Sequence, residues 1–252
     1  MQISFDLLYT GMMVFIRAGG LLALLPVFSG QSVPVQIRLA IAVLLAYLAG
    51  AQAQPTSAIP DSMLALITIA VRELFIGLLM GFAIRLIFYA IEFAGQVMST
   101  EIGLTVSSQI DPISRQTSSP VGTALFYLGS LLFLISGCHH AVFLAFLRSF
   151  QIAPVGAIAF HRDTAEALVS ASGNIFLVAL QMAAPLLAVN FVVTFAFAIL
   201  GKAAPSINVF SESFSVRVLV GIAILGLTLG LTAQAVLSAL RGSPEMMLRV
   251  IP

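Results

Sequence analysis

Three residues with reactive side chains stand next to one another in the middle of this chain: Cys138, His139 and His140. A thiol and two imidazoles are ordinary ligands of a transition metal. Neighbouring residues on a helix, however, point about 100° apart. The sequence holds no other cluster of cysteine or histidine that would complete a tetrahedral set. The pattern therefore does not favour a metal site, and we expect no cofactor.

Motifs of hydrolytic and phosphate chemistry are missing from the sequence. Serines are plentiful, but none lies in a GxSxG turn. There is no GxxxxGK[ST] loop for phosphates and no HExxH pair for zinc. An intramembrane hydrolase that pairs a serine with His139 or His140 therefore lacks a supporting motif. We predict that the chain is not an enzyme.

Charged side chains embedded in apolar sequence are the more informative feature. Residues 63–91 hold Arg72, Glu73 and Arg85, and Arg17 lies in the same way near the N-terminus. A charge in the middle of a bilayer costs roughly 2.5 kcal/mol or more on insertion scales, so it usually faces protein or a water-filled path. We predict that these residues pack against other helices, including those of other subunits.

Arg85 and Glu92 are seven residues apart and so lie on nearly the same face of a helix. A proton relay is one interpretation of such a pair in a membrane protein. A structural ion pair, or contacts to the carbonyl groups of a partner, is the favoured alternative. In either case we expect both residues to contribute to subunit packing.

The composition is that of a membrane protein. Of the 252 residues, 60% are hydrophobic and only 8% are charged, and the mean hydropathy is +1.10. Soluble domains carry about 25% charged residues, so this inventory cannot cover a soluble surface. A net charge of +1 argues against nucleic acid as a partner, and membrane lipid is expected instead.

Six apolar segments predict an all-α fold of membrane-associated helical hairpins. They are Phe5–Leu25, Val35–Gly50, Met63–Ile91, Thr123–Leu147, Asn174–Leu200 and Val218–Leu240. A helix needs about 20 apolar residues to cross a bilayer, and the second segment is shorter than that. Residues 92–122 are too apolar for a flexible linker and too polar for lipid. Such backbone occurs at membrane depth only where it is buried in protein or lines an aqueous cavity.

Small residues four apart occur twice in this apolar sequence, as Gly77 with Gly81 and as Gly226 with Gly230. Glycines at this spacing share a helix face and allow another backbone to approach closely. The partner helix is either in this chain or in another subunit, and the sequence leaves both open. Pro185, inside an apolar segment, predicts a kink. With residues 92–122 it also fits a secondary transporter built on broken helices, but no internal repeat supports that alternative.

Four groups of residues, in order along most of the chain, resemble the motifs of the FliR family, the R component of the flagellar type III export gate, with relatives in injectisomes. The first is Arg72-Glu73-Leu74-Phe75-Ile76-Gly77. The second runs from Ala94-Gly95-Gln96 through Gly103-Leu104 to Asp111-Pro112 and Ser114. The third comprises His139-His140, Ser149-Phe150 and Pro154-Val155-Gly156, and the fourth is residues 201–210, GKAAPSINVF. Lys202 and Ser206 depart from the arginine and glutamine usual in the last motif.

The resemblance implies a subunit of a larger helical hetero-oligomer in the bacterial inner membrane, at the flagellar basal body. Its partners would be the P and Q components of the gate, the B component, the large export-gate protein and the unfolded proteins that pass through. It also implies a P-like portion over residues 1–173 and a Q-like hairpin over residues 174–252. Use in an injectisome is the alternative.

The resemblance further implies roles for particular residues. A pore plug within the loop 92–122 would contain Gly103, Gln109, Asp111, Pro112, Arg115 and Gln116. A cytoplasmic loop would contain Lys202, Pro205, Asn208, Phe210 and Arg217. Subunit packing would involve the residues already singled out, namely Gly77, Gly81, Gly226, Gly230, Arg72, Glu73, Arg85 and Glu92.

Overall fold

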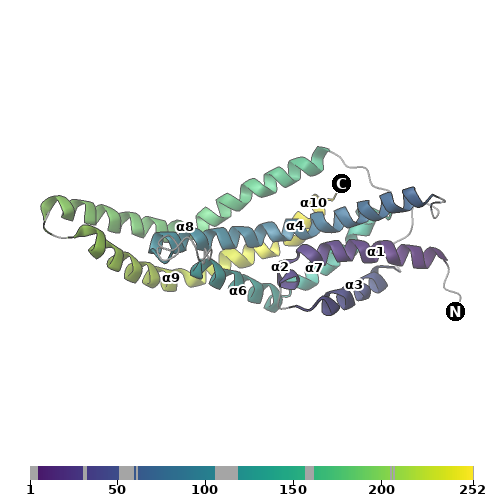
Figure 1. Cartoon of the computed structure of the whole chain (residues 1–252), viewed down its shortest axis with the longest axis horizontal. Helices are drawn as coiled ribbons and strands as arrows, with labels where there is room; N and C mark the ends of the chain where they lie inside the picture. Colours follow the sequence, from purple (N-terminus) through teal and green to yellow (C-terminus); the bar gives the residue numbers. More distant parts are fainter. Residues whose placement is uncertain are drawn as a thin grey trace. The chain divides into compact units, whose positions relative to one another are not determined.

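The structure is a computed structural model that describes residues 5–30, 33–50, 60, 62–105, 119–156, 162–204, 206 and 208–251. Every regular element in these ranges is a helix, which confirms the all-α prediction. The helices are α1 (Phe5–Leu24), α2 (Pro26–Ser29), α3 (Val35–Gly50), α4 (Met63–Ile102), α6 (Pro120–Ile135), α7 (Cys138–Ile152), α8 (Arg162–Ala203), α9 (Val209–Arg241) and α10 (Ser243–Arg249). Figure 1 shows them in order along the chain.

Several of these helices are long and apolar enough to cross a membrane, as the composition predicted. In the described part of the chain, four segments meet this condition: α1, α4, Glu166–Ala203 in α8, and Ser211–Arg249, which covers most of α9 and all of α10. The pair α6 and α7 would supply a fifth span, but the two helices meet at an angle of 69°. At 16 residues, α3 is short for a bilayer.

The boundaries of two helices differ from the predicted segments. Helix α4 continues to Ile102, although residues 92–102 were expected to belong to a loop. Its polar side chains find partners locally, since Thr100 Oγ1 donates a hydrogen bond to Gln96 O at 3.0 Å. The predicted segment Thr123–Leu147 is instead broken into α6 and α7. The break lies at Gly137, whose φ of +73° belongs to the left-handed region that glycine adopts at little cost.

The chain divides into two compact units, each assembled from separate stretches of sequence. Unit 1 comprises Met1–Ile87, Phe133–Gly173 and Ala239–Pro252, and unit 2 comprises Phe88–Leu132 and Asn174–Ser238. Both units therefore contain part of α4 and part of α8. The division predicted at residues 173 and 174, into a P-like portion and a Q-like hairpin, stays a prediction.

The core of unit 1 lies around α1. Helix α3 packs on α1, and its buried residues are Ala42, Leu45, Ala46 and Ala49, which are spaced three, one and three apart on one face. Elsewhere in the unit, Leu79 and Ala83 of α4 form a buried cluster with Val250, at the end of α10. Small residues on the inner face of α3 thus allow close packing.

Unit 2 consists of the second part of α4, most of α6, and the long hairpin of α8 and α9 (Figure 1). The rings of Phe88 and Phe126 pack edge to face, with centroids 5.6 Å apart. Helices α4 and α6 approach so closely that a β-carbon on Gly95 would clash with the backbone of Gly122. The core of this unit therefore depends on direct contact between backbones.

Candidate functional site

A fully buried ion pair links the first and fourth helices of unit 1. Arg17 Nε of α1 donates to Glu73 Oε2 at 2.7 Å, and Arg17 Nη2 lies 2.7 Å from the same oxygen. Neither side chain has any exposed surface. Such a pair stabilises a fold only if further hydrogen bonds satisfy the remaining donors and acceptors, so the other partners of these two side chains matter.

Those partners come from the end of α7 and the loop that follows it. Arg17 Nη1 donates to Ser149 Oγ at 3.1 Å, and Arg17 Nη2 donates to the Ala153 carbonyl at 2.9 Å. The Gly156 N–H donates to Glu73 Oε1 at 3.3 Å. The guanidinium carbon also lies 4.1 Å from the centre of the Phe150 ring, which is within cation–π range. We call these residues, with Arg17 and Glu73, the Arg17 cluster.

Close packing of α1 on α4 is what brings the two charges together. A β-carbon on Gly20 would lie 2.6 Å from Leu74 O, and one on Gly81 would lie 2.7 Å from Leu21 O. One on Gly77 would overlap Arg17 O. Gly77 and Gly81 therefore contact α1 of the same chain, whereas packing of either residue on another subunit stays a prediction. Around Gly226 and Gly230, no described atom lies within 4 Å of a β-carbon.

The other embedded charges lie elsewhere on α4. Arg85 Nη1 donates to Ser29 Oγ, after α1 in the same unit, at 3.3 Å. Arg72 and Glu92 are half-buried. Arg85 and Glu92 lie on the one continuous helix α4, and their roles in subunit packing or proton transfer stay predictions.

The reactive triplet lies at the break between α6 and α7. Cys138 is buried, and its Sγ accepts a hydrogen bond from Ser136 Oγ at 3.1 Å. The rings of His139 and His140 have centroids 3.9 Å apart. Over the described ranges, no three His, Cys, Asp or Glu side chains come together in a way that could hold a metal ion.

The ends of the predicted plug loop are held by unit 2. Ser99 Oγ lies 3.0 Å from Ser119 Oγ and accepts the Val121 N–H at 3.1 Å. Ser119 Oγ also accepts the Gly122 N–H at 3.0 Å. At the other end, Gly103 has a φ of +91°. The predicted plug residues Gln109, Asp111, Pro112, Arg115 and Gln116 lie outside the described residues.

The turn between α8 and α9 is shorter than the predicted cytoplasmic loop. Lys202 belongs to the last turn of α8, and α9 begins at Val209, so Arg217 lies two turns inside a helix. Asn208 starts that helix, because its Oδ1 accepts the Ser211 N–H at 3.4 Å. Serines in this stretch bond within the helix, as Ser215 Oγ does to Ser211 O. Pro205 and the side chain of Phe210 are outside the described residues.

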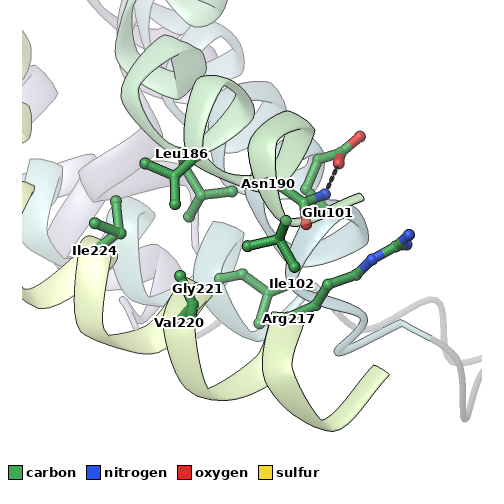
Figure 2. A pocket seen from close by; sticks show the side chains of 10 residues that line it. Glu101, Ile102, Leu186, Asn190, Arg217, Val220, Gly221 and Ile224 are labelled. Carbon is green, nitrogen blue, oxygen red and sulfur yellow. Dashed lines mark hydrogen bonds between the residues drawn. The ribbon is translucent and has the colours of Figure 1, made fainter. Parts of the chain in front are cut away.

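A second group of polar side chains, in unit 2, was missed in the sequence. Glu101, Asn190 and Arg217 line a recess with apolar neighbours (Figure 2). Asn190 Nδ2 donates to Glu101 Oε2. One signal was available, since Asn190 is an amide within the apolar run of residues 182–193, but its partner is 89 residues away in sequence.

Motifs that are far apart in the sequence therefore meet in the Arg17 cluster. The Arg72–Gly77 motif supplies Glu73, and its Gly77 permits the approach of α1. The third group of motifs supplies Ser149, Phe150 and Gly156. The cluster has no exposed reactive group, because its donors and acceptors are directed at one another. What the arrangement can do is hold three segments of unit 1 in a fixed geometry inside an apolar surrounding.

The chain is similar to known proteins over most of its length. The chain is 28% identical to the flagellar biosynthetic protein FliR of Caulobacter vibrioides over 222 residues, covering 88% of each chain. It is 27% identical to the FliR protein of Escherichia coli over 218 residues, covering 86% of this chain and 83% of that protein. It is also 28% identical to Yop proteins translocation protein T of Yersinia pestis over 148 residues, covering 58% and 57% of the two chains. Residues 8–242 match the sequence profile described as bacterial export proteins, family 1, and the chain therefore belongs to that family.

Proposed function

We propose that this chain is a core subunit of the flagellar type III protein export gate in the bacterial inner membrane. The observation that carries the proposal is the family match over residues 8–242, together with FliR relatives that cover most of the chain. The meeting of the family's motifs in one buried cluster supports it further. In this role the chain has no catalytic task and helps to form and close a path for unfolded flagellar proteins.

The exposed apolar surface of unit 2 supports assembly with other subunits. The most apolar windows of α8 and α9 are only 11% and 6% buried, against 67% for α4. Gly226 and Gly230 leave a strip of α9 that another backbone can approach closely. The partners we propose are the P and Q components of the gate, the B component and the large export-gate protein, with lipid at the rim. The Q-like role assigned to residues 174–252 fits this exposure.

The role of a pore plug is proposed for the segment that begins at Gly103. Its two ends are bonded in unit 2, through the Gly103 N–H to Thr100 O and through Ser119 Oγ to Ser99 Oγ. A closing segment needs fixed ends so that it returns to one position after a protein has passed. Lys202, Asn208 and Arg217 are proposed to lie at the cytoplasmic end of the assembly.

An injectisome role is the second candidate, because the chain is similar to the translocation protein T of Yersinia pestis. That similarity covers 58% of this chain, less than the similarity to the FliR proteins. A secondary transporter has less support, since the relatives carry the names of flagellar biosynthesis and translocation proteins.

Deletion of the gene tests the proposal and separates the two candidates. A flagellar role predicts that the deletion strain secretes no hook or filament protein, and that the intact gene on a plasmid restores secretion. Loss of secreted effectors with normal flagella would assign the chain to an injectisome. Normal export in both systems would refute the proposal.

A further inference from the structure

The end of α4 lies against one face of the first turns of α9. Phe214, Arg217 and Gly221 are three and four residues apart and so share that face. A β-carbon on Gly103 would lie 2.7 Å from Phe214 Cε2, and one on Gly221 would lie 3.3 Å from Ile102 Cβ. A side chain added at Gly103 would therefore displace the Phe214 ring, and one added at Gly221 would displace the side chain of Ile102. We call this contact, between residues 101–103 and residues 214–224, the α4–α9 seam.

The seam is not fully closed. A recess runs along it, with Glu101 and Asn190 on one side and Arg217 on another (Figure 2). Glu101 accepts a hydrogen bond from the neutral amide of Asn190. The Nε atom of Arg217 is buried and has no hydrogen-bond partner among the described residues. A buried donor without a partner is costly. A rearrangement of these three side chains that gives Arg217 Nε an acceptor would therefore lower the free energy.

The packing of α1 on α4 in unit 1 provides a contrast. There the glycines bring the backbones into direct contact, and the buried guanidinium of Arg17 is bonded to a carboxylate, a hydroxyl and a carbonyl. A change of geometry at that contact would break these hydrogen bonds and would form no better ones. The α4–α9 seam has a recess, a buried donor without a partner, and a carboxylate that is paired with a neutral group.

We infer that the α4–α9 seam is the contact in this chain that rearranges during export, and that Arg217 then replaces Asn190 as the partner of Glu101. The exchange would give the buried Nε an acceptor and would pair a carboxylate with a cation, which makes a stronger hydrogen bond than a neutral amide does. Because the chain leaves α4 at Gly103, a shift of the seam redirects the chain at that point. Phe214 lies against Gly103 and Arg217 lines the recess beside Glu101, so both are positioning residues for the end of α4. The inference rests on the proposed function.

A reversible cross-link across the seam tests whether it must move. In a C138A background, which removes the one native cysteine, the variant I102C/G221C places two β-carbons about as close as the 3.5–4.5 Å of a disulfide. The matched control is G201C/V209C, where the corresponding distance is 3.8 Å. The control joins α8 to α9 and leaves α4 free. Secretion of a flagellar protein is measured in cells before oxidation, after oxidation, and after reduction, with the cross-linked fraction read from gels.

We expect oxidation of I102C/G221C to lower export at least tenfold and reduction to restore it, whereas the cross-linked control exports normally. Unchanged export by the cross-linked seam variant would overturn the inference, as would an equal block by the control. Failure of I102C/G221C to cross-link where the control does would also overturn it, because the seam geometry would be wrong. Normal export by a strain that lacks the gene would instead refute the proposed function.

A charge swap tests the change of partner. The variants E101R and R217E each place two like charges along the recess, and each is expected to lower export several-fold. The double variant E101R/R217E restores the opposite charges in reverse and is expected to regain at least half of the export of the native chain. If the double variant exports no more than the single variant with the lower export, Glu101 and Arg217 do not pair.

Discussion

Replacing Glu73 by alanine removes the carboxylate that lies 2.7 Å from two nitrogens of the Arg17 guanidinium. Both side chains are fully buried, so the guanidinium is left buried without its counter-charge. Breaking a buried ion pair by removing one partner costs about 3–5 kcal/mol. Since each 1.4 kcal/mol is a factor of ten, the ratio of folded to unfolded chain should fall roughly a hundredfold or more. That is a large share of the ~5–15 kcal/mol that holds a typical domain together.

The same chain offers a matched control. Glu245 forms an ion pair with Arg249 at 3.9 Å, and the two side chains are 83% and 78% exposed. An exposed pair one helical turn apart contributes about 0.3–0.5 kcal/mol. The variants E73A and E245A therefore make the same chemical change in opposite surroundings. The stability of each variant is measured by pulse proteolysis of the detergent-purified assembly in increasing urea. The amount of each variant present in the membrane is measured as well.

A double variant separates charge from hydrogen bonding. In R17M/E73L both buried charges are gone, so the loss of stability should be smaller than in E73A. The loss of stability should not vanish, because the Ala153 carbonyl and the Gly156 N–H lose their partners. Each buried group left without a partner costs about 1–3 kcal/mol. Equal stability of E73A and E245A would refute the reasoning, and so would a double variant less stable than E73A.

Three further predictions concern backbone contacts and the connection after α4. The variant G77A should prevent correct packing of α1 on α4, because its β-carbon would overlap Arg17 O. The control G19A should be neutral, because no atom lies within 4 Å of a β-carbon there. The amount of chain in the membrane is measured for both variants. Deletion of residues 106–119 should leave assembly intact and make the membrane leak ions; a small-solute permeability assay that detects no leak would contradict the plug role. The variant G137A should lose about 1–2 kcal/mol, because an alanine is strained at a φ of +73°. The variant G137N should lose less, since asparagine tolerates that region, and thermal aggregation of the purified assembly distinguishes the two.

Much of the fold follows from the apolar runs of the sequence. The segment Val35–Gly50 coincides with α3 as described, and the predicted segment Phe5–Leu25 contains α1. Errors arose where a helix continues into polar residues. Residues such as Ser99 and Thr100 suggest a loop when counted by composition. However, Thr100 Oγ1 donates to Gln96 O within α4, and Ser99 Oγ bonds to Ser119 Oγ. The mean hydropathy of a stretch of sequence carries no information on such hydrogen-bond partners.

The Arg17 cluster could be anticipated only in part. Embedded charges predict burial against protein, and this holds for Arg17 and Glu73. Which charge meets which depends on the crossing of α1 and α4, and the pair is separated by 56 residues. The glycines that permit the crossing were visible as a pattern, but a GxxxG pattern does not say which helix fills it. The contribution of the Gly156 N–H was beyond sequence reasoning, since any residue other than proline carries that donor.

The central claim is that this chain works as one subunit of an export gate, and its companions in the membrane test that claim most directly. The native chain is tagged at its C-terminus, purified gently in detergent from its own membrane, and its companions are identified by mass spectrometry. We predict several copies of the P and Q components for each copy of this chain, held together through the apolar faces of α8 and α9. Recovery of the chain as a stable, lone monomer would contradict the account.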